Sequence, residues 1–228
     1  MKKILISDYP WETRVATTKN EKLQNVYFTS PMSNSLERCF FKGVVTTVLP
    51  GIQTAFVDIG QEKSGFLHIS EIDRDLAIGK MDDLELDEIP NEPKVEKNQP
   101  KATADISKIF KENDRILVQV SKEPVYEKGP KLTTCFALPG RFIVLMPNIA
   151  RIGISKKIEN REERQRLREL VTSMLPKGMG AIVRTSSETC TTSALSKDIA
   201  FLVSTWSSIK NRYARAKDGE KIYEDLPL

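Results

Sequence analysis

The sequence contains a single histidine and three cysteines, and this scarcity narrows the chemistry open to it. The cysteines, Cys39, Cys135 and Cys190, lie far apart and form no CxxC pair. Because His68 is the sole histidine, we do not expect a structural zinc site within one chain. An odd number of separated thiols favours a reducing compartment, so a cytoplasmic location is predicted.

Long apolar runs and a strong net charge are also lacking. No stretch reaches the length needed to cross a bilayer, and the opening MKKILISDYPWE has no signal-peptide core, so no membrane span is expected. Apolar residues make up 39% and charged residues 29% of the 228 residues, which is typical of a soluble globular protein. Lys and Arg exceed Asp and Glu by 35 − 31 = 4, which permits a nucleic-acid partner without requiring one.

Alternating apolar and polar residues dominate the first part of the chain. Residues 2–28 predict two or three strands, and a denser series follows in CFFKGVVTTVLPGIQTAFVDIG, SGFLHISEI and RILVQVSKEP. Residues 76–113 are acidic, then rich in Lys and Pro, and predict a mobile insertion. Five short strands with glycine corners and one long inserted loop predict a small closed antiparallel barrel of the OB type.

The rest of the chain mixes strands with two helices, which makes the predicted fold class α+β. KLTTCFALPG, RFIVLMP and GMGAIVRT predict strands, and Asn160 with Glu163 predicts a capping box. The first helix has the apolar positions Leu167, Leu170, Val171, Met174 and Leu175. The last helix has Leu195, Ile199, Leu202, Trp206, Ile209 and Tyr213. Their spacing favours a packed helix face over a base-stacking platform of Trp206 and Tyr213.

Two phenylalanines fall in the polar row of the predicted barrel strands. Alternation turns Ala55, Val57, Ile59, Leu67 and Ile69 inward, and it turns Phe56 and Phe66 outward. On an OB binding face such rings stack on bases, which contributes about 1–3 kcal/mol per base. Phosphate attraction would come from Lys42, Lys63, His68, Lys122 and Lys128. Alternatively, another domain or the insertion covers both rings.

The motifs also follow one another in the order found in a known protein family. GVVTTVLPGIQTAFVDIGQEKSGFLHISEI resembles the RNA-binding OB domain, of the S-one type, of the ribonuclease E/G family. KGPKLTT resembles the exit from that domain, and LPGRFIVLMPN, IGISKKIE, LPKGMGAIVRTSSE and LVSTWSSIKNR resemble its 5′-sensor. The resemblance covers nearly the whole chain, with the shorter G-type members closer. It implies N-terminal strands of an incomplete RNase-H-like subdomain (1–38), the OB domain (39–134) and a small mixed α/β 5′-sensor (135–228).

The resemblance assigns two sets of RNA contacts. Single-stranded RNA would be held by Phe56, Phe66 and Lys128. A 5′-monophosphate would be bound by the planar guanidinium group of Arg184 and by the hydroxyl group of Thr185. Neighbouring contacts would come from the positions that match Gly140, Val144 and Lys156. Judged from the residues alone, Arg184 could instead pair with Glu188 at a strand edge.

The resemblance places catalysis outside this sequence. The family cleaves RNA with magnesium held by two aspartates in a DNase-I-like subdomain, and a two-cysteine zinc link joins two subunits. Neither segment has a match here, so we expect no catalytic residue, no metal site and no cofactor in this chain. Mg²⁺ and a homo-oligomer are expected of the full-length enzyme. The acidic stretches DDLELDE and ENREER are interpreted as solvated charge.

The resulting hypothesis is the RNA-recognition half of an E/G-type endoribonuclease, a hydrolase of RNA processing such as rRNA maturation and mRNA decay. Its expected partner is single-stranded RNA with a 5′-monophosphate. One alternative is a free-standing, non-catalytic single-stranded RNA-binding protein. Another is a scaffold whose barrel face contacts protein.

Overall fold

A computed structural model describes residues 1–29, 35–72 and 105–225. The chain divides into two compact units, Met1–Leu36 with Glu224–Leu228, and Glu37–Tyr223, and each is described by itself. Within the described residues, no helix has both the length and the apolar character required to cross a membrane.

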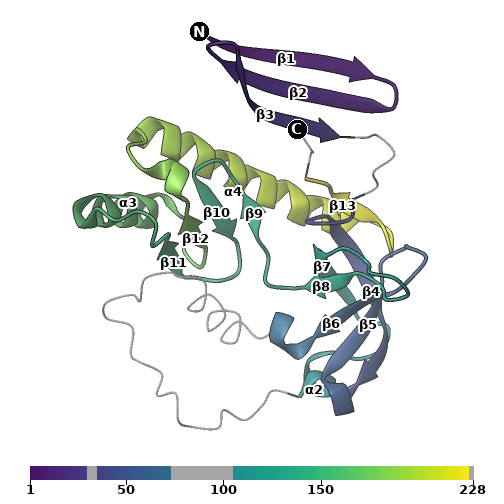
Figure 1. Ribbon diagram of the computed structural model, residues 1–228. Helices are drawn as coiled ribbons and strands as arrows, with labels where there is room; N and C mark the ends of the chain where they lie inside the picture. The colour runs from purple at the N-terminus through teal and green to yellow at the C-terminus, as the bar shows by residue number, and fades with distance from the viewer. Residues whose placement is uncertain (30–34, 73–104, 226–228) are drawn as a thin grey trace. The chain divides into compact units, whose positions relative to one another are not determined.

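The first unit contains a three-stranded antiparallel sheet in the order β1-β2-β3 (Figure 1). Its strands are β1 (Lys2–Tyr9), β2 (Glu12–Lys19) and β3 (Lys22–Thr29). The expectation of two or three strands here is therefore confirmed. Apolar side chains of β1 are exposed, with Ile4 and Ile6 each at 69%. Assignment of this sheet to an RNase-H-like subdomain stays a prediction.

The second unit begins with a closed five-stranded barrel, which confirms the predicted OB-type architecture. Its strands are β4 (Phe40–Leu49), β5 (Thr54–Asp58), β6 (Gly65–His68), β7 (Arg115–Lys122) and β8 (Lys131–Thr133), and β13 (Lys221–Tyr223) pairs with β4. The barrel is mixed rather than wholly antiparallel, because β6 and β8 run parallel. A closed ring with an odd number of strands cannot alternate direction at every pair, so one parallel pair is required.

The barrel interior follows the predicted alternation, with two exceptions. The residues predicted to turn inward are buried: Ala55, Val57, Ile59, Leu67 and Ile69. Alternation along β5 and β7 would turn Thr54 and Gln119 outward, but they are only 7% and 4% exposed. The Gln119 side chain donates to Ala137 O at 2.9 Å and accepts from Ala137 N at 2.9 Å. Burial of an amide is tolerated here because its hydrogen bonds are satisfied.

One end of the predicted insertion packs against the barrel. Residues 105–113 include helix α2 (Ile106–Ile109), which is capped by Asp105. Ile106 is fully buried, and its N–H donates to Gln53 Oε1 at 3.0 Å. This end of the segment is therefore anchored, contrary to a wholly mobile insertion. Residues 76–104 of the predicted insertion lie outside the described residues.

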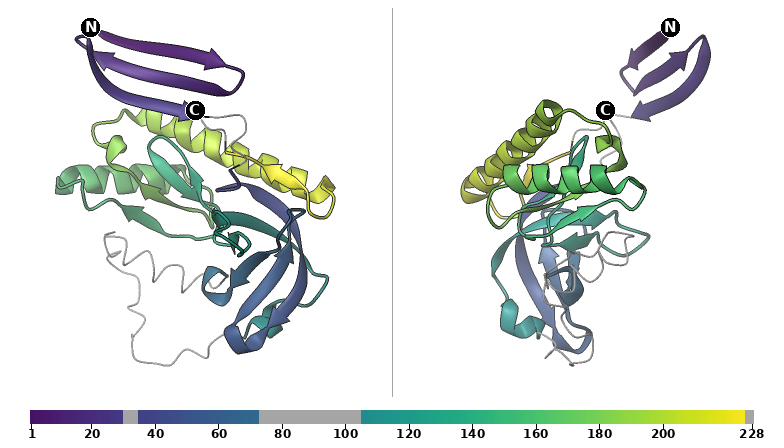
Figure 2. Two further views of the ribbon diagram at one scale, coloured as in Figure 1. Left: turned by 45° about the vertical axis from the view of Figure 1, so that its right-hand side comes forward. Right: turned by 90° about the vertical axis from the view of Figure 1, so that its left-hand side faces the viewer.

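A four-stranded sheet with two helices follows, in the strand order β11-β12-β10-β9. The strands are β9 (Leu138–Pro139), β10 (Ile143–Met146), β11 (Ile152–Ile154) and β12 (Gly180–Val183). Helices α3 (Arg161–Met174) and α4 (Thr192–Arg215) lie on one side of this sheet (Figure 2). The described residues also form three short 3₁₀ turns: η1 (Pro50–Ile52), η2 (Ile69–Glu71) and η3 (Thr185–Ser187).

The helices begin and pack as the sequence indicates. Asn160 Oδ1 accepts the N–H of Glu163 at 3.1 Å, which confirms the N-cap of α3. The Glu163 carboxylate, predicted to return to Asn160, binds the Arg166 guanidinium and the N–H of Thr189. Trp206 of α4 is 7% exposed, and its ring lies 5.3 Å from that of Phe136. Trp206 is thus a core residue, not a platform for bases.

The barrel and the four-stranded sheet share one hydrophobic core. The cluster includes Phe40 of β4, Ile143 of β10, Trp206 of α4 and Ile222 of β13. A shared core fixes the barrel and the sheet against each other within this unit, because close-packed interiors resist deformation.

Candidate nucleic-acid interface

The outer face of the barrel carries one row of residues that runs across all five strands. Phe56 pairs directly with Phe66, Thr47 with Phe56, and Phe66 with Lys131. Lys131 in turn pairs with Lys122 of β7. Residues opposite each other in a sheet share a face. The row therefore presents a hydroxyl, two aromatic rings and two ammonium groups in succession.

Both rings are half-buried, not sealed in the core. Among the described residues, neither Phe56 nor Phe66 stacks on another aromatic ring. The faces of the two rings are therefore not stacked on each other or on a third described ring. A role in base stacking requires such unstacked faces. The alternative that the insertion covers them falls on residues outside the described ones.

Two of the neighbouring lysines differ in their partners. Lys131 Nζ lies 2.5 Å from Glu71 Oε1, and the two side chains are 27% and 15% exposed. Its charge is therefore partly balanced within the chain. Lys128 is exposed in the loop between β7 and β8, and its N–H donates to Val125 O at 3.1 Å. An exposed ammonium on a loop can reach a phosphate at little desolvation cost.

Gly129 brings the Lys128 loop against the strand that carries Phe66. A Cβ at position 129 would lie 1.9 Å from Ser64 O, so only glycine fits. The N–H of Phe66 donates to Pro130 O at 3.0 Å. Lys63, from the turn before β6, donates to Tyr126 O at 3.3 Å in the same loop. Lys63 and Lys128 therefore lie in neighbouring loops at one corner of the barrel, beside Phe56 and Phe66, and both carry a positive charge there.

His68 and Lys42 do not serve as free cations of this face. The Nδ1 of His68 accepts the N–H of Ser70 at 3.2 Å and caps η2. Lys42 donates to Ala216 O at 2.9 Å, and its ammonium lies over the Tyr213 ring at 5.3 Å. The expectation that Lys42 attracts phosphate at the barrel face is not supported, because α4 and its following turn engage this side chain.

The residues predicted to bind a 5′-phosphate lie at one edge of the four-stranded sheet. Arg184 is exposed, and its Nη1 donates to Gly140 O at 2.6 Å. Its partner is thus a backbone carbonyl rather than Glu188, and among the described residues Arg184 forms no ion pair. Thr185 follows directly and is exposed as well.

The loop 140–143 is held from two sides. Its carbonyls accept bonds from the segment after β12: Arg184 N to Phe142 O at 2.9 Å, Ser186 Oγ to Arg141 O at 2.5 Å and Ser187 Oγ to Phe142 O at 2.6 Å. Its N–H groups donate to the Asp198 carboxylate of α4. The position of Arg184 is therefore coupled to the shape of this loop.

Val144 and Lys156 lie close to Arg184 by strand register. Val144 pairs with Ile182 of β12, two positions before Arg184, and is half-buried. β11 runs parallel to β12, with Ile154 opposite Val183, so Lys156 and Arg184 follow strands that end at the same edge. Lys156 is exposed there.

Arg164 of α3 supports the loop that carries Lys156. Its guanidinium donates to Ser155 O at 2.8 Å and to Ile158 O at 2.7 Å. Burial lowers the pKa of this guanidinium from its ordinary value, and the charge of nearby Arg168 adds to the effect. The turn after β11 is therefore held against α3 by these hydrogen bonds.

Sequence reasoning missed three residues, of which two follow from strand register. Thr47 and Lys131 flank the ring pair in the row described above. Arg141 follows Gly140, is exposed, and its guanidinium lies 5.0 Å from the Phe142 ring. The adjacency of Arg141 to Gly140 was the one signal available in the sequence.

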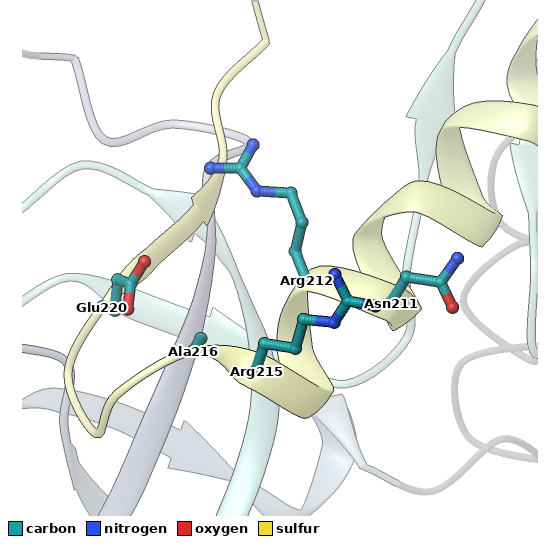
Figure 3. Close-up of a pocket in the computed structure, with 5 residues that line it drawn as sticks. All are labelled: Asn211, Arg212, Arg215, Ala216 and Glu220. Atoms are coloured by element: carbon teal, nitrogen blue, oxygen red, sulfur yellow. The ribbon is translucent and has the colours of Figure 1, made fainter.

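The described residues lack a metal-ligand cluster, and they form a pocket apart from the predicted RNA contacts. Within residues 1–29, 35–72 and 105–225, no three His, Cys, Asp or Glu side chains are grouped so as to hold a metal ion. A pocket of about 340 Å³ lies at the end of α4 (Figure 3). It is lined by Asn211, Arg212, Arg215, Ala216 and Glu220, so none of the predicted RNA contacts lines it.

Comparison with known proteins agrees with this geometry. Residues 40–134, which contain the barrel, match the S1 RNA binding domain, and residues 137–228 match the Ribonuclease E/G family. The chain is similar to the ribonuclease E/G family over nearly its whole length. This confirms the resemblance, and the matched S1 domain contains the Phe56–Phe66 pair.

Individual relatives cover most of this chain but only part of their own length. Ribonuclease G of Escherichia coli (strain K12) is 33% identical over 227 residues, which are 99% of this chain and 43% of that protein. Ribonuclease G of Haemophilus influenzae is 35% identical over the same share. Ribonuclease E of Nostoc sp. is 36% identical over 171 residues, 75% of this chain and 22% of that protein. The chain thus spans less than half the length of these ribonuclease E/G relatives.

Proposed function

We propose that this chain binds single-stranded RNA and senses its 5′-monophosphate, as part of a magnesium-dependent endoribonuclease of RNA processing. The observation that carries the proposal is the direct register of Phe56 with Phe66 within the matched S1 domain. The processes it would serve are rRNA maturation and mRNA decay, in the cytoplasm, with the full-length enzyme as a homo-oligomer.

The barrel face would hold the body of the RNA strand. Successive unpaired bases stack on Phe56 and Phe66, each contact contributing about 1–3 kcal/mol. Lys122 and Lys128 attract the phosphates, and Lys131 contributes less because Glu71 already balances its charge. Stacking is sequence-tolerant, since every base has a π-face, so a broad set of single-stranded sites is expected.

The sensor edge would hold the phosphorylated tip. One N–H of Arg184 is used on Gly140 O, which orients the planar guanidinium and leaves its other N–H groups for phosphate oxygens. The Thr185 hydroxyl adds a further donor. Lys156 and Arg141 supply positive charge nearby, and Val144 packs beside the site. We also propose the division into 1–38, 39–134 and 135–228.

Catalysis is proposed for the whole protein and not for these residues. Mg²⁺, where bound, would activate water for hydrolysis of an internal phosphodiester bond. The described residues do not offer a set of acidic side chains that fits such an ion. No step of the cleavage is therefore assigned to them.

A binding titration with matched RNAs tests the proposal. Fluorescence anisotropy would compare a 5′-monophosphorylated single strand, the same strand with a 5′-hydroxyl, and the corresponding duplex. We expect affinity in the order monophosphate, hydroxyl, duplex. Equal affinity for all three would contradict it. Incubation of the chain with Mg²⁺ and labelled RNA then tests where catalysis resides, because robust cleavage would show that it resides in this chain.

A further inference from the structure

We infer that Asp198 of α4 is a positioning residue for the 5′-phosphate contact. The inference deepens the proposed function and rests on it. Among the described residues, Asp198 forms no hydrogen bond to Arg184 or Thr185, the two residues proposed to bind the phosphate. It acts through the loop 140–143, whose Gly140 carbonyl orients Arg184.

The Asp198 carboxylate organises three consecutive backbone donors. Oδ1 accepts from Arg141 N at 3.1 Å, and Oδ2 accepts from Phe142 N at 2.8 Å and from Ile143 N at 3.3 Å. Hydrogen bonds to a charged acceptor are stronger than neutral ones. The carboxylate therefore fixes the turn at the point where the chain enters β10.

Close packing excludes other arrangements of this turn. A Cβ on Gly140 would lie 2.7 Å from Asp198 Oδ2 and 2.7 Å from Leu202 Cδ1. Gly140 thus lies directly against α4, which explains why glycine is needed there. The N–H of Gly140 donates to Ile143 O at 2.7 Å and closes the turn.

The occupied donors have a consequence for phosphate recognition. Because Asp198 already accepts the N–H groups of residues 141–143, these groups do not bind phosphate. Recognition falls to side chains, chiefly Arg184 and Thr185. Asp198 also places a negative charge on the α4 side of the loop. Arg184 itself is oriented by the Gly140 carbonyl and forms no ion pair among the described residues.

The test compares Asp198→Asn with the wild-type chain and with Arg184→Ala. Asparagine keeps one acceptor oxygen but turns an NH₂ group toward at least one backbone donor. We expect the affinity ratio of 5′-monophosphate to 5′-hydroxyl RNA to fall by about 3- to 10-fold, with hydroxyl-end affinity unchanged. Glu169→Gln, which removes one exposed negative charge from α3, should leave the ratio unchanged.

Each outcome decides a separate point. If the wild-type chain shows no preference, the proposed sensor fails and this inference fails with it. If Arg184→Ala abolishes the preference while Asp198→Asn keeps it, only the positioning role is overturned. Equal loss for both RNAs would also overturn it. Should Asp198→Asn fail to fold by thermal melting, Ser186→Ala, which frees Arg141 O, must lower the same ratio or the inference is wrong.

We also infer that the pocket at the end of α4 is a second contact for the RNA backbone. This inference depends on RNA binding by the barrel but not on 5′-sensing. The pocket of about 340 Å³ carries the guanidinium groups of Arg212 and Arg215, and neither has a hydrogen-bond or ion-pair partner among the described residues. In Figure 3 the Arg212 side chain extends toward β13, whereas that of Arg215 turns back along the helix toward Asn211.

Local charge favours a phosphate ligand there. Residues 210–221 contain five Lys or Arg and two Asp or Glu, a net charge of 5 − 2 = +3, against +4 for the whole chain. One of the acids, Asp218, is bonded to Arg115 at 3.0 Å. Because the two guanidinium groups do not converge, successive phosphates of a passing strand fit better than one enclosed phosphate.

Basic residues in the last turn also stabilise a helix through its dipole, by about 0.3–1 kcal/mol. RNA length separates that role from a contact. The double change Arg212→Ala with Arg215→Ala should weaken binding of a 5′-hydroxyl 30-mer and reduce its log–log salt slope by about 0.7 per lost contact. An 8-mer that fills only the barrel should bind as before. An unchanged 30-mer slope, or equal weakening of both RNAs, would overturn the second contact.

Discussion

Phe56 of β5 and Phe66 of β6 are direct cross-strand partners on the outer face of the barrel. Thr47 lies on one side of the pair and Lys131 on the other. The arrangement places two rings at the spacing of adjacent strands, about 4.5–5.5 Å between their Cβ atoms. The pair is the basis of the RNA-binding account.

Removing either ring should weaken RNA binding whatever the 5′ end carries. We expect Phe56→Ala or Phe66→Ala to cost about 1–3 kcal/mol, or about 5- to 150-fold in Kd, because one base loses its stacking partner. Anisotropy titration measures the change. Phe201→Ala is the matched control, since Phe201 is 66% exposed on α4. The same loss in the control would show that the effect is not specific to the barrel face.

Arg184→Ala should remove only the preference for monophosphate ends. Charge-assisted hydrogen bonds contribute about 1.5–3 kcal/mol, so the affinity ratio should fall by about 10- to 150-fold while hydroxyl-end RNA binds unchanged. Competition binding with the two RNAs measures the ratio, and Arg168→Ala on α3 serves as control. A ratio that survives in Arg184→Ala would disprove the sensor assignment.

Lys128→Ala should reduce the salt dependence of binding. Each phosphate contact on a single strand contributes about 0.7 to the slope of log K against log salt. Lys128 is exposed, so we expect its removal to lower the slope by about that amount. Titrations between 50 and 200 mM salt, roughly the range over which such slopes are read, measure it. An unchanged slope would place Lys128 outside the RNA path.

Gly129→Ala should damage the barrel corner that carries Lys128. A Cβ there would meet Ser64 O at 1.9 Å, and overpacking of this kind costs about 1–3 kcal/mol of unfolding free energy. Gly51→Ala is the control, because a Cβ at position 51 meets nothing within 4 Å. Urea denaturation compares the two. Similar stabilities for both variants would contradict the packing described here.

Stability should depend on pH through Glu163 in the acid range. Hydrogen bonds from Arg166 hold the pKa of Glu163 below its ordinary value of 4.5. Since the folded-state pKa is depressed, this stabilisation is present above about pH 4.5 and is lost as the pH falls through the folded-state value. Glu163→Gln should therefore flatten the fall in unfolding free energy below that pH, and Glu169→Gln should not. Parallel acid denaturation curves for wild type and Glu163→Gln would contradict this.

Local pattern predicted most of the fold. Alternation placed Val57 and Leu67 in the barrel, and the step of three and four residues placed Trp206 in the core, because these rules depend only on strand and helix periods. Burial of Gln119 could not be predicted, since its partner Ala137 is 18 residues away. The parallel β6–β8 pair depends likewise on closure of the whole barrel.

In the candidate site, too, some residues could be predicted from local sequence and others depend on tertiary contacts. Sequence motifs led to the prediction of Phe56, Phe66 and Arg184 as RNA contacts, whereas their neighbours in the structure follow from register and tertiary contact. Lys131 joins the ring pair across β6 and β8, and Asp198 reaches loop 140–143 from a helix more than fifty residues later, at 57 positions from Arg141. The hydrogen bond of Lys42 to Ala216 O could not be predicted, because the turn after α4 that accepts it follows 174 residues further on.

Photo-crosslinking with a 5′-monophosphorylated single strand addresses the account most directly. The strand would carry a photoreactive base near its 5′ end and another in its body, and the crosslinked peptides would be mapped by mass spectrometry. The account predicts that the body crosslinks to strands β5 and β6 at Phe56 and Phe66, and the tip to peptides around Gly140 and Arg184. Crosslinks from both positions that map elsewhere would contradict it.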